Sequence, residues 1–150
     1  MSAIRTAADF EASRAALERA VGSSCAGQDY WPRAIVAGID AALEFAAESP
    51  GAAQVLTERA GERWKEREPR FTAMVERFAR LLARGAPPAN PRLPSPQGVV
   101  ICIVKLVNLR IESGRPQEVR ELAPDLAFLA LLPFVGFAGA QRWSQLTAAA

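Results

Sequence analysis

The side chains best suited to chemistry in this sequence are aromatic and sulfur-containing groups that suit a binding site. Five of them fall close together along the chain: Phe45, Trp64, Phe71, Met74 and Phe78. Methionine and aromatic side chains line adaptable apolar pockets for small molecules. We therefore take these five as candidate ligand-binding residues. An ordinary hydrophobic core is the alternative explanation for each of them.

A second candidate group lies on an apolar run later in the chain. Lys105, Asn108 and Glu112 are spaced i, i+3 and i+7, which places them on one face of a helix. They could supply the few polar groups of a pocket, or they could form the solvated edge of an interface helix. We assign Lys105 and Asn108 to ligand binding, together with the apolar Ile101.

Catalytic and metal-binding groups are sparse. The sequence has no histidine, and its two cysteines, Cys25 and Cys102, have no basic partner in a recognisable motif. It contains no G-x-G-x-x-G, no Walker-type phosphate loop and no C-x-x-C. We expect no enzyme activity, no catalytic or metal-binding residues and no cofactor.

Length and composition favour one soluble domain over residues 1–150. Half of the 150 residues are apolar, and a chain of this length buries roughly 70% of its unfolded surface. Basic and acidic residues nearly balance, with a net charge of +2, and they alternate along the chain, so no basic face for nucleic acid is expected.

No targeting segment is expected. The N-terminus lacks the apolar run of a signal peptide, which predicts a cytoplasmic protein with reduced thiols. The stretch Leu126–Gln141 has no charge, but it is short for a membrane span and is interrupted by Pro133 and Gly136. We therefore expect no membrane insertion.

Apolar residues recur every three or four positions along most of the chain, which predicts helices. The first expected segments are a helix from residue 4 that ends near Gly22-Ser23-Ser24, a loop over Ser23–Gln28, and helices over Trp31–Glu48, Pro50–Ala60 and Glu62–Arg84, with Pro69 as a kink or the true start of the last of these. A proline-rich loop over Ala86–Pro96 follows. The remaining expected helices are Gln97–Ser113, Pro116–Leu122 and Pro124–Gln145, the last with a bend at Pro133.

The segment Gln97–Ser113 is ambiguous because its β-branched run, Val99–Val104, would suit a buried strand. Its length, the Ser95-Pro96 start and Gly114 after its end favour a helix. A helix that is apolar nearly all round must be buried on several sides. In a chain this small, a second subunit is expected to cover part of it.

The order of these motifs resembles the C-terminal ligand-binding and dimerisation domain of TetR-family transcriptional regulators. The residues that carry the resemblance are Trp31-Pro32-Arg33-Ala34-Ile35, Ser49-Pro50-Gly51-Ala52-Ala53, Leu81-Leu82-Ala83-Arg84-Gly85, Glu112-Ser113-Gly114, Leu122-Ala123-Pro124-Asp125-Leu126 and Leu132-Pro133-Phe134-Val135-Gly136. TetR-like regulators begin with a three-helix DNA-binding domain, and we find no counterpart of it in this chain. We therefore expect no DNA binding by the chain itself.

The resemblance implies an all-α bundle of six to seven helices that forms a homodimer through its last two long helices, Gln97–Ser113 and Pro124–Gln145. A pocket would lie among the four helices between Trp31 and Ser113, and ligand binding would shift a linker-like helix at residues 1–22. The expected interface residues are Val104, Ile111, Leu129, Leu132, Phe134 and Phe137.

The expected function is that of a ligand-sensing and dimerisation domain of a TetR-like repressor, which binds a small, largely apolar effector. The alternative is a helical interaction module that binds no ligand and modulates a full-length regulator by forming a dimer with it.

Overall fold

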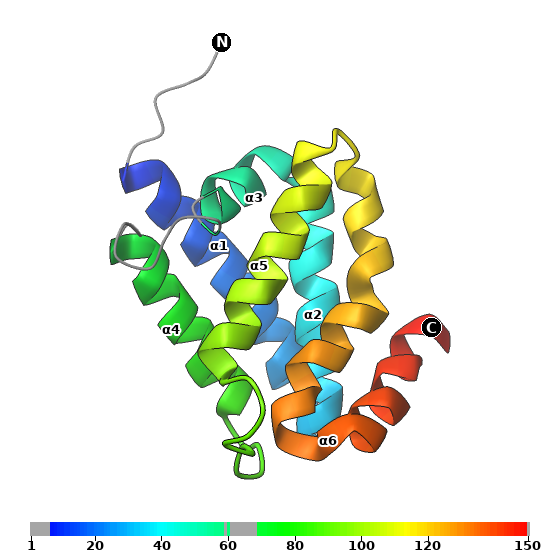
Figure 1. Ribbon diagram of the computed structural model, residues 1–150. Coiled ribbons are helices and arrows are strands. Elements are labelled where there is room, and N and C mark those ends of the chain that lie inside the picture. Colours follow the sequence, from blue (N-terminus) through cyan, green and yellow to red (C-terminus); the bar gives the residue numbers. More distant parts are fainter. Residues whose placement is uncertain (1–6, 59, 61–68, 150) are drawn as a thin grey trace.

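The computed structural model describes residues 7–58, 60 and 69–149, and this part of the chain is a bundle of helices without strands. Its elements are α1 (Ala7–Ala26), α2 (Trp31–Glu48), α3 (Pro50–Thr57), α4 (Pro69–Ala83), α5 (Pro96–Glu112), the 3-10 helix η2 (Pro116–Leu122) and α6 (Ala123–Ala149). Helix α2 packs against α1, α3, η2 and α6, and Figure 1 shows it behind α5. The all-α prediction is confirmed.

Proline and serine signals set most helix starts. A proline occupies the first turn of α2, α3 and α5, where its missing N–H leaves no hydrogen bond broken. At the start of α5, the Gly98 N–H donates to the Ser95 hydroxyl at 3.1 Å. The β-branched run Val99–Val104 is therefore helical, as the capped start predicts.

Two clusters of buried side chains hold the helices together. The larger joins Phe71 and Met74 of α4 to Leu56 of α3 and Leu131 of α6. The smaller packs α2 and α5 against η2, around the fully buried Val119. On the outside, the Arg120 guanidinium donates to both carboxylate oxygens of Glu44, which lowers the pKa of that carboxyl and ties η2 to α2.

Helix α1 is longer than expected, and the prediction of a loop over Ser23–Gln28 is wrong for its first four residues. The reason lies in α2. A carbon added at Gly38 would stand 2.9 Å from Cys25 Sγ and 3.4 Å from Val21 Cγ1, so the two helices approach closely there. This packing holds Ser23–Ala26 helical although serine and cysteine have weak helix propensity.

Helix α6 changes direction at Gly136, not at Pro133 as expected. Gly136 has φ 75° and ψ 179°, a conformation open almost exclusively to glycine. Beyond it the chain turns back along the bundle (Figure 1). The break frees the Pro133 carbonyl, which accepts the Asn90 N–H of the proline-rich loop at 2.8 Å. The last helix is thus two shorter segments.

Trp31 joins three helices at one end of the bundle. Its indole Nε1 donates to the Leu82 carbonyl of α4 at 2.8 Å. Its ring meets the edge of Phe134 of α6, with ring centroids 5.1 Å apart. Together these contacts fix the end of α4 relative to α2 and α6.

By length and composition alone, the stretch Pro116–Gln145 could cross a membrane. Core helices of soluble proteins have the same composition, and Leu126, Ala127, Ala130 and Leu131 of this stretch are wholly buried in the bundle.

Candidate functional site: an apolar cavity between the helices

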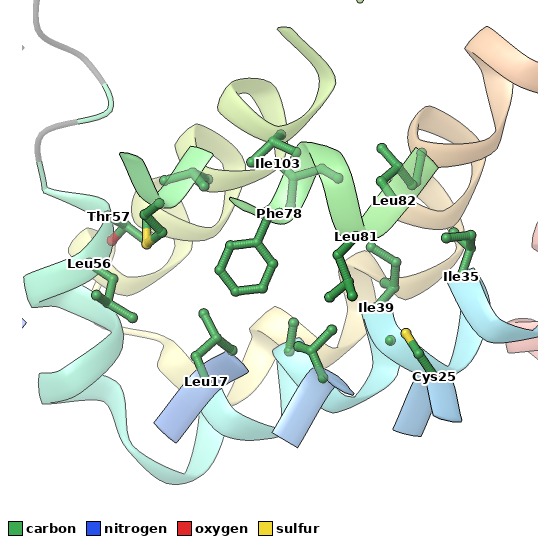
Figure 2. Close-up of a pocket in the computed structure, with 17 residues that line it drawn as sticks. Leu17, Cys25, Ile35, Ile39, Leu56, Thr57, Phe78, Leu81, Leu82 and Ile103 are labelled. Carbon is green, nitrogen blue, oxygen red and sulfur yellow. The ribbon is translucent and has the colours of Figure 1, made fainter. Parts of the chain in front are cut away.

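An apolar cavity of about 140 Å³, partly open to solvent, lies between the helices (Figure 2). Each of the helices α1 to α5 contributes two or more residues to its wall, and α6 contributes Ala130. The lining residues are Leu17, Val21, Cys25, Ile35, Gly38, Ile39, Ala42, Leu56, Thr57, Met74, Phe78, Leu81, Leu82, Val100, Ile103, Val104 and Ala130. An apolar cavity of about 150 Å³ engineered in another protein holds benzene or xenon, so this space can take a small apolar guest.

The cavity exists because α1 and α4 do not pack closely on each other. Helix α1 packs on α2 and α3, whereas α4 packs on α5. An ion pair between α1 and α4 joins Glu18 Oε1 to Arg77 Nε at 2.6 Å, and Arg14 pairs with the other Glu18 oxygen at 2.6 Å. Glu18 directly follows the lining residue Leu17 in the sequence, and Arg77 directly precedes the lining residue Phe78.

Helix α4 supplies the bulkiest part of the wall. Its apolar residues recur at helical spacing, so one face of α4 enters the bundle. Figure 2 shows the Phe78 ring in the middle of the cavity, with Leu17 and Leu81 beside it. An aromatic ring placed there offers a flat, polarisable surface to a guest.

Two polar side chains reach the wall, at opposite ends of the cavity in Figure 2. The Thr57 hydroxyl donates to Asn108 Oδ1 at 2.9 Å, and Thr57 is only 7% exposed. The Cys25 thiol donates to the Ala34 carbonyl at 3.3 Å. Burial raises the pKa of this thiol, so it is protonated at neutral pH and is a poor nucleophile.

The structure brings together part of the ligand-binding set expected from the sequence. Met74 and Phe78 line the cavity, and Asn108 holds the hydroxyl of the lining residue Thr57. The remaining residues lie elsewhere: Phe71 is wholly buried in the larger cluster, Phe45 and Ile101 pack against that cluster, Lys105 is exposed, and Trp64 lies outside the described residues.

The residues expected at a dimer interface are also divided. Val104 lines the cavity, Phe134 packs on Trp31, and Ile111, Leu129 and Leu132 are half-buried against the two clusters. Phe137 is 66% exposed, with its ring 5.3 Å from that of Phe128. Leu109 of α5 is 61% exposed. Among the side chains that the structure describes, Leu109 of α5 and Phe137 of α6 are thus large, apolar and exposed.

The cavity residues that sequence reasoning missed come mainly from α1 and α2. Leu17, Val21, Ile35 and Ile39 follow the helical spacing of an apolar face, and that pattern was visible. No local signal distinguishes an apolar face that borders a space from one that is fully packed. Cys25 and Gly38 could be placed only once the close contact between α1 and α2 was known.

Among the residues that the structure describes, no group of three or more histidine, cysteine, aspartate or glutamate side chains is arranged to hold a metal ion. In comparisons with known proteins, no family model, no curated protein and no solved structure matched this chain. Functional inference therefore depends on the residues and their geometry.

Proposed function

We propose that the chain is a ligand-sensing and dimerisation domain of the kind found in TetR-like regulators, and that its cavity binds a small apolar effector. The single observation that carries the ligand-sensing part is the apolar cavity of about 140 Å³ between the helices. Protein interiors are otherwise packed as tightly as organic crystals, with few voids larger than a water molecule. The order of sequence motifs supports the family assignment.

The cavity is well placed to couple a ligand to the rest of a regulator. Its wall includes Leu17 and Val21 of α1, the helix that corresponds to the linker helix in the resemblance, and Val104 of α5. A guest that fits one arrangement of α1 and α4 better than another shifts the population towards it. Such differential affinity is what effector control requires.

Dimerisation is proposed from the outer surfaces of α5 and α6. Leu109 of α5 and Phe137 of α6 are 61% and 66% exposed, on the two helices that the resemblance places at a dimer interface. A second copy of the chain that covers them would remove this surface from water. The chain would act without binding operator DNA itself, in the cytoplasm.

Ligand binding is tested by thermal unfolding of the full chain, at fixed protein concentration, with and without benzene. A ligand that binds only the folded state adds RT ln(1+[L]/Kd), about 2.7 kcal/mol at a hundredfold excess over Kd. A rise in Tm that saturates with benzene concentration supports the sensor. If neither Tm nor any amide resonance responds up to the solubility of benzene, the sensor proposal is wrong.

Dimerisation is tested by light scattering. We expect a molar mass of twice 16.1 kDa for the chain, and a shift towards 16.1 kDa for Phe137→Glu. Ala73→Glu introduces the same charge at an exposed position of α4 and should leave the dimer intact. A monomeric native chain, or a Phe137→Glu variant that stays fully dimeric, would contradict the proposed interface.

The alternative function, an interaction module without a ligand, is favoured by the same exposed side chains. Leu109 and Phe137 could contact another regulator as readily as a second copy. A dimer that shows no response to benzene would support this alternative.

A further inference from the structure

The chemical character of the cavity wall defines which guests it accepts. We propose that the cavity selects unfunctionalised hydrocarbons of the size of benzene or toluene and discriminates against their hydroxylated analogues. This inference rests on the proposed ligand-sensing function, since it specifies the class of effector for the same site.

The first step of the argument concerns the side chains of the wall. Fifteen of the seventeen lining residues are apolar or glycine, and the exceptions are Thr57 and Cys25. Both exceptions already have protein partners: the Thr57 hydroxyl donates to Asn108 Oδ1 at 2.9 Å, and the Cys25 thiol donates to the Ala34 carbonyl at 3.3 Å. Neither polar hydrogen is left for a guest, and the two groups can offer a guest only acceptor lone pairs.

The second step concerns the backbone. Most of the wall belongs to helices, whose N–H and C=O groups are bonded along the helix axis. Thr57 ends α3, where a free carbonyl would be expected, but its carbonyl accepts the Ala60 N–H at 3.0 Å. The wall therefore offers no free donor, and the oxygen of a hydroxylated guest would lose the donors that water supplies without gaining one from the protein.

The third step concerns size and contact chemistry. The volume of about 140 Å³ is close to that of an apolar cavity that holds benzene. Phe78 and Met74 bring an aromatic ring and a thioether to the wall, and both groups make favourable contacts with an aromatic guest. These contacts favour an aromatic hydrocarbon within the class.

Toluene and phenol are matched probes because they have the same number of heavy atoms and differ in one methyl or hydroxyl group. We expect the full chain to bind phenol about tenfold to a hundredfold more weakly than toluene, which is the cost of burying the phenol oxygen without a donor. The measurement is the dissociation constant of each probe from an amide-detected nuclear magnetic resonance titration.

Asn108→Ala removes the acceptor that holds the Thr57 hydroxyl, and Asn108 itself does not line the cavity. The freed hydroxyl can then pair with a guest, so the affinity for phenol relative to toluene should rise about threefold to tenfold, the effect of one neutral hydrogen bond. Lys105→Ala, an exposed substitution one turn earlier on α5, should leave the ratio as in the native chain.

The outcomes separate the two proposals. Toluene binding well above phenol binding supports hydrocarbon selectivity. Phenol binding equal to or tighter than toluene binding overturns the selectivity and leaves the ligand site standing. Binding of neither probe overturns both proposals. A folded Asn108→Ala variant with an unchanged ratio would overturn the role given to the hydrogen bond between Thr57 and Asn108.

Discussion

Filling the cavity from one side should stabilise the protein and abolish guest binding together. Ala42 lies on α2 and lines the cavity, next to Gly38 and Ile39 on the same face. Ala42→Leu adds three carbon atoms, and we expect them to extend into the space of about 140 Å³ that Ala42 borders.

The magnitude follows from the added carbons. Each buried methylene contributes about 0.8 kcal/mol, so three contribute at most about 2.4 kcal/mol. Ordering the new side chain and small adjustments of the wall offset part of this gain, and cavity-filling substitutions commonly yield about 0.5–2 kcal/mol. We expect Ala42→Leu to raise the free energy of unfolding by about 1 kcal/mol, which raises Tm by about 2–4 °C for a chain of this length.

The assay is urea unfolding followed by circular dichroism, at one protein concentration because a dimer's stability depends on it. Ala73→Leu is the matched control, since Ala73 is exposed on α4 and the change should stay within about 0.5 kcal/mol. Toluene should raise the Tm of the control and not that of Ala42→Leu. Destabilisation by Ala42→Leu beyond about 1 kcal/mol, with an unaffected control, would show that the space is not there to be filled.

Three further predictions concern glycines and the two thiols. Gly136→Ala should lower the free energy of unfolding by about 1–3 kcal/mol, because the φ of 75° and ψ of 179° at this residue suit only glycine. Gly22→Ala should raise the free energy of unfolding by about 0.5–1 kcal/mol, because nothing lies within 4 Å of the added carbon and alanine is the better helix former. Changes of the same sign for both variants in urea unfolding would contradict this reasoning. Gly38→Ala should lower the free energy of unfolding by about 1–3 kcal/mol, because its new carbon would lie 2.9 Å from Cys25 Sγ. Most of this loss should disappear in a Cys25→Ala background. Additive effects of the two substitutions in a double-mutant cycle would rule out this contact as the cause. Burial raises the pKa of the Cys25 thiol, so the stability that the thiol contributes is complete below about pH 8.5 and is lost as pH rises through the folded-state pKa. The native chain should therefore lose stability over that pH range relative to Cys25→Ala. A thiol reagent should modify the exposed Cys102 before Cys25, and equal modification rates for the two thiols would contradict the burial of Cys25.

The helices could be predicted largely from residues with strong local preferences. Ser95 and the proline after it start α5 as expected, although its β-branched run has strand propensity. Local preference fails at Ser23–Ala26, where contact with Gly38 of α2 extends α1. It also fails at Pro133, since a proline can continue this helix while Gly136 takes a conformation that reverses the chain.

The cavity could be predicted only in part, for a physical reason. Met74 and Phe78 attracted attention through their chemistry, and both line it. A cavity, however, is a space that several helices leave between them, and α1 contributes to this one by failing to pack against α4. Val104 illustrates the ambiguity: its sequence position suits an interface, but its side chain faces the cavity.

The most direct test of the central claim, that this space accepts an apolar guest, is X-ray diffraction from crystals held under xenon. Xenon enters apolar cavities of this size and is located by its anomalous scattering. We predict a xenon peak in the space bordered by Leu17, Ile39 and Phe78. Xenon at other positions with none in this space would contradict the claim.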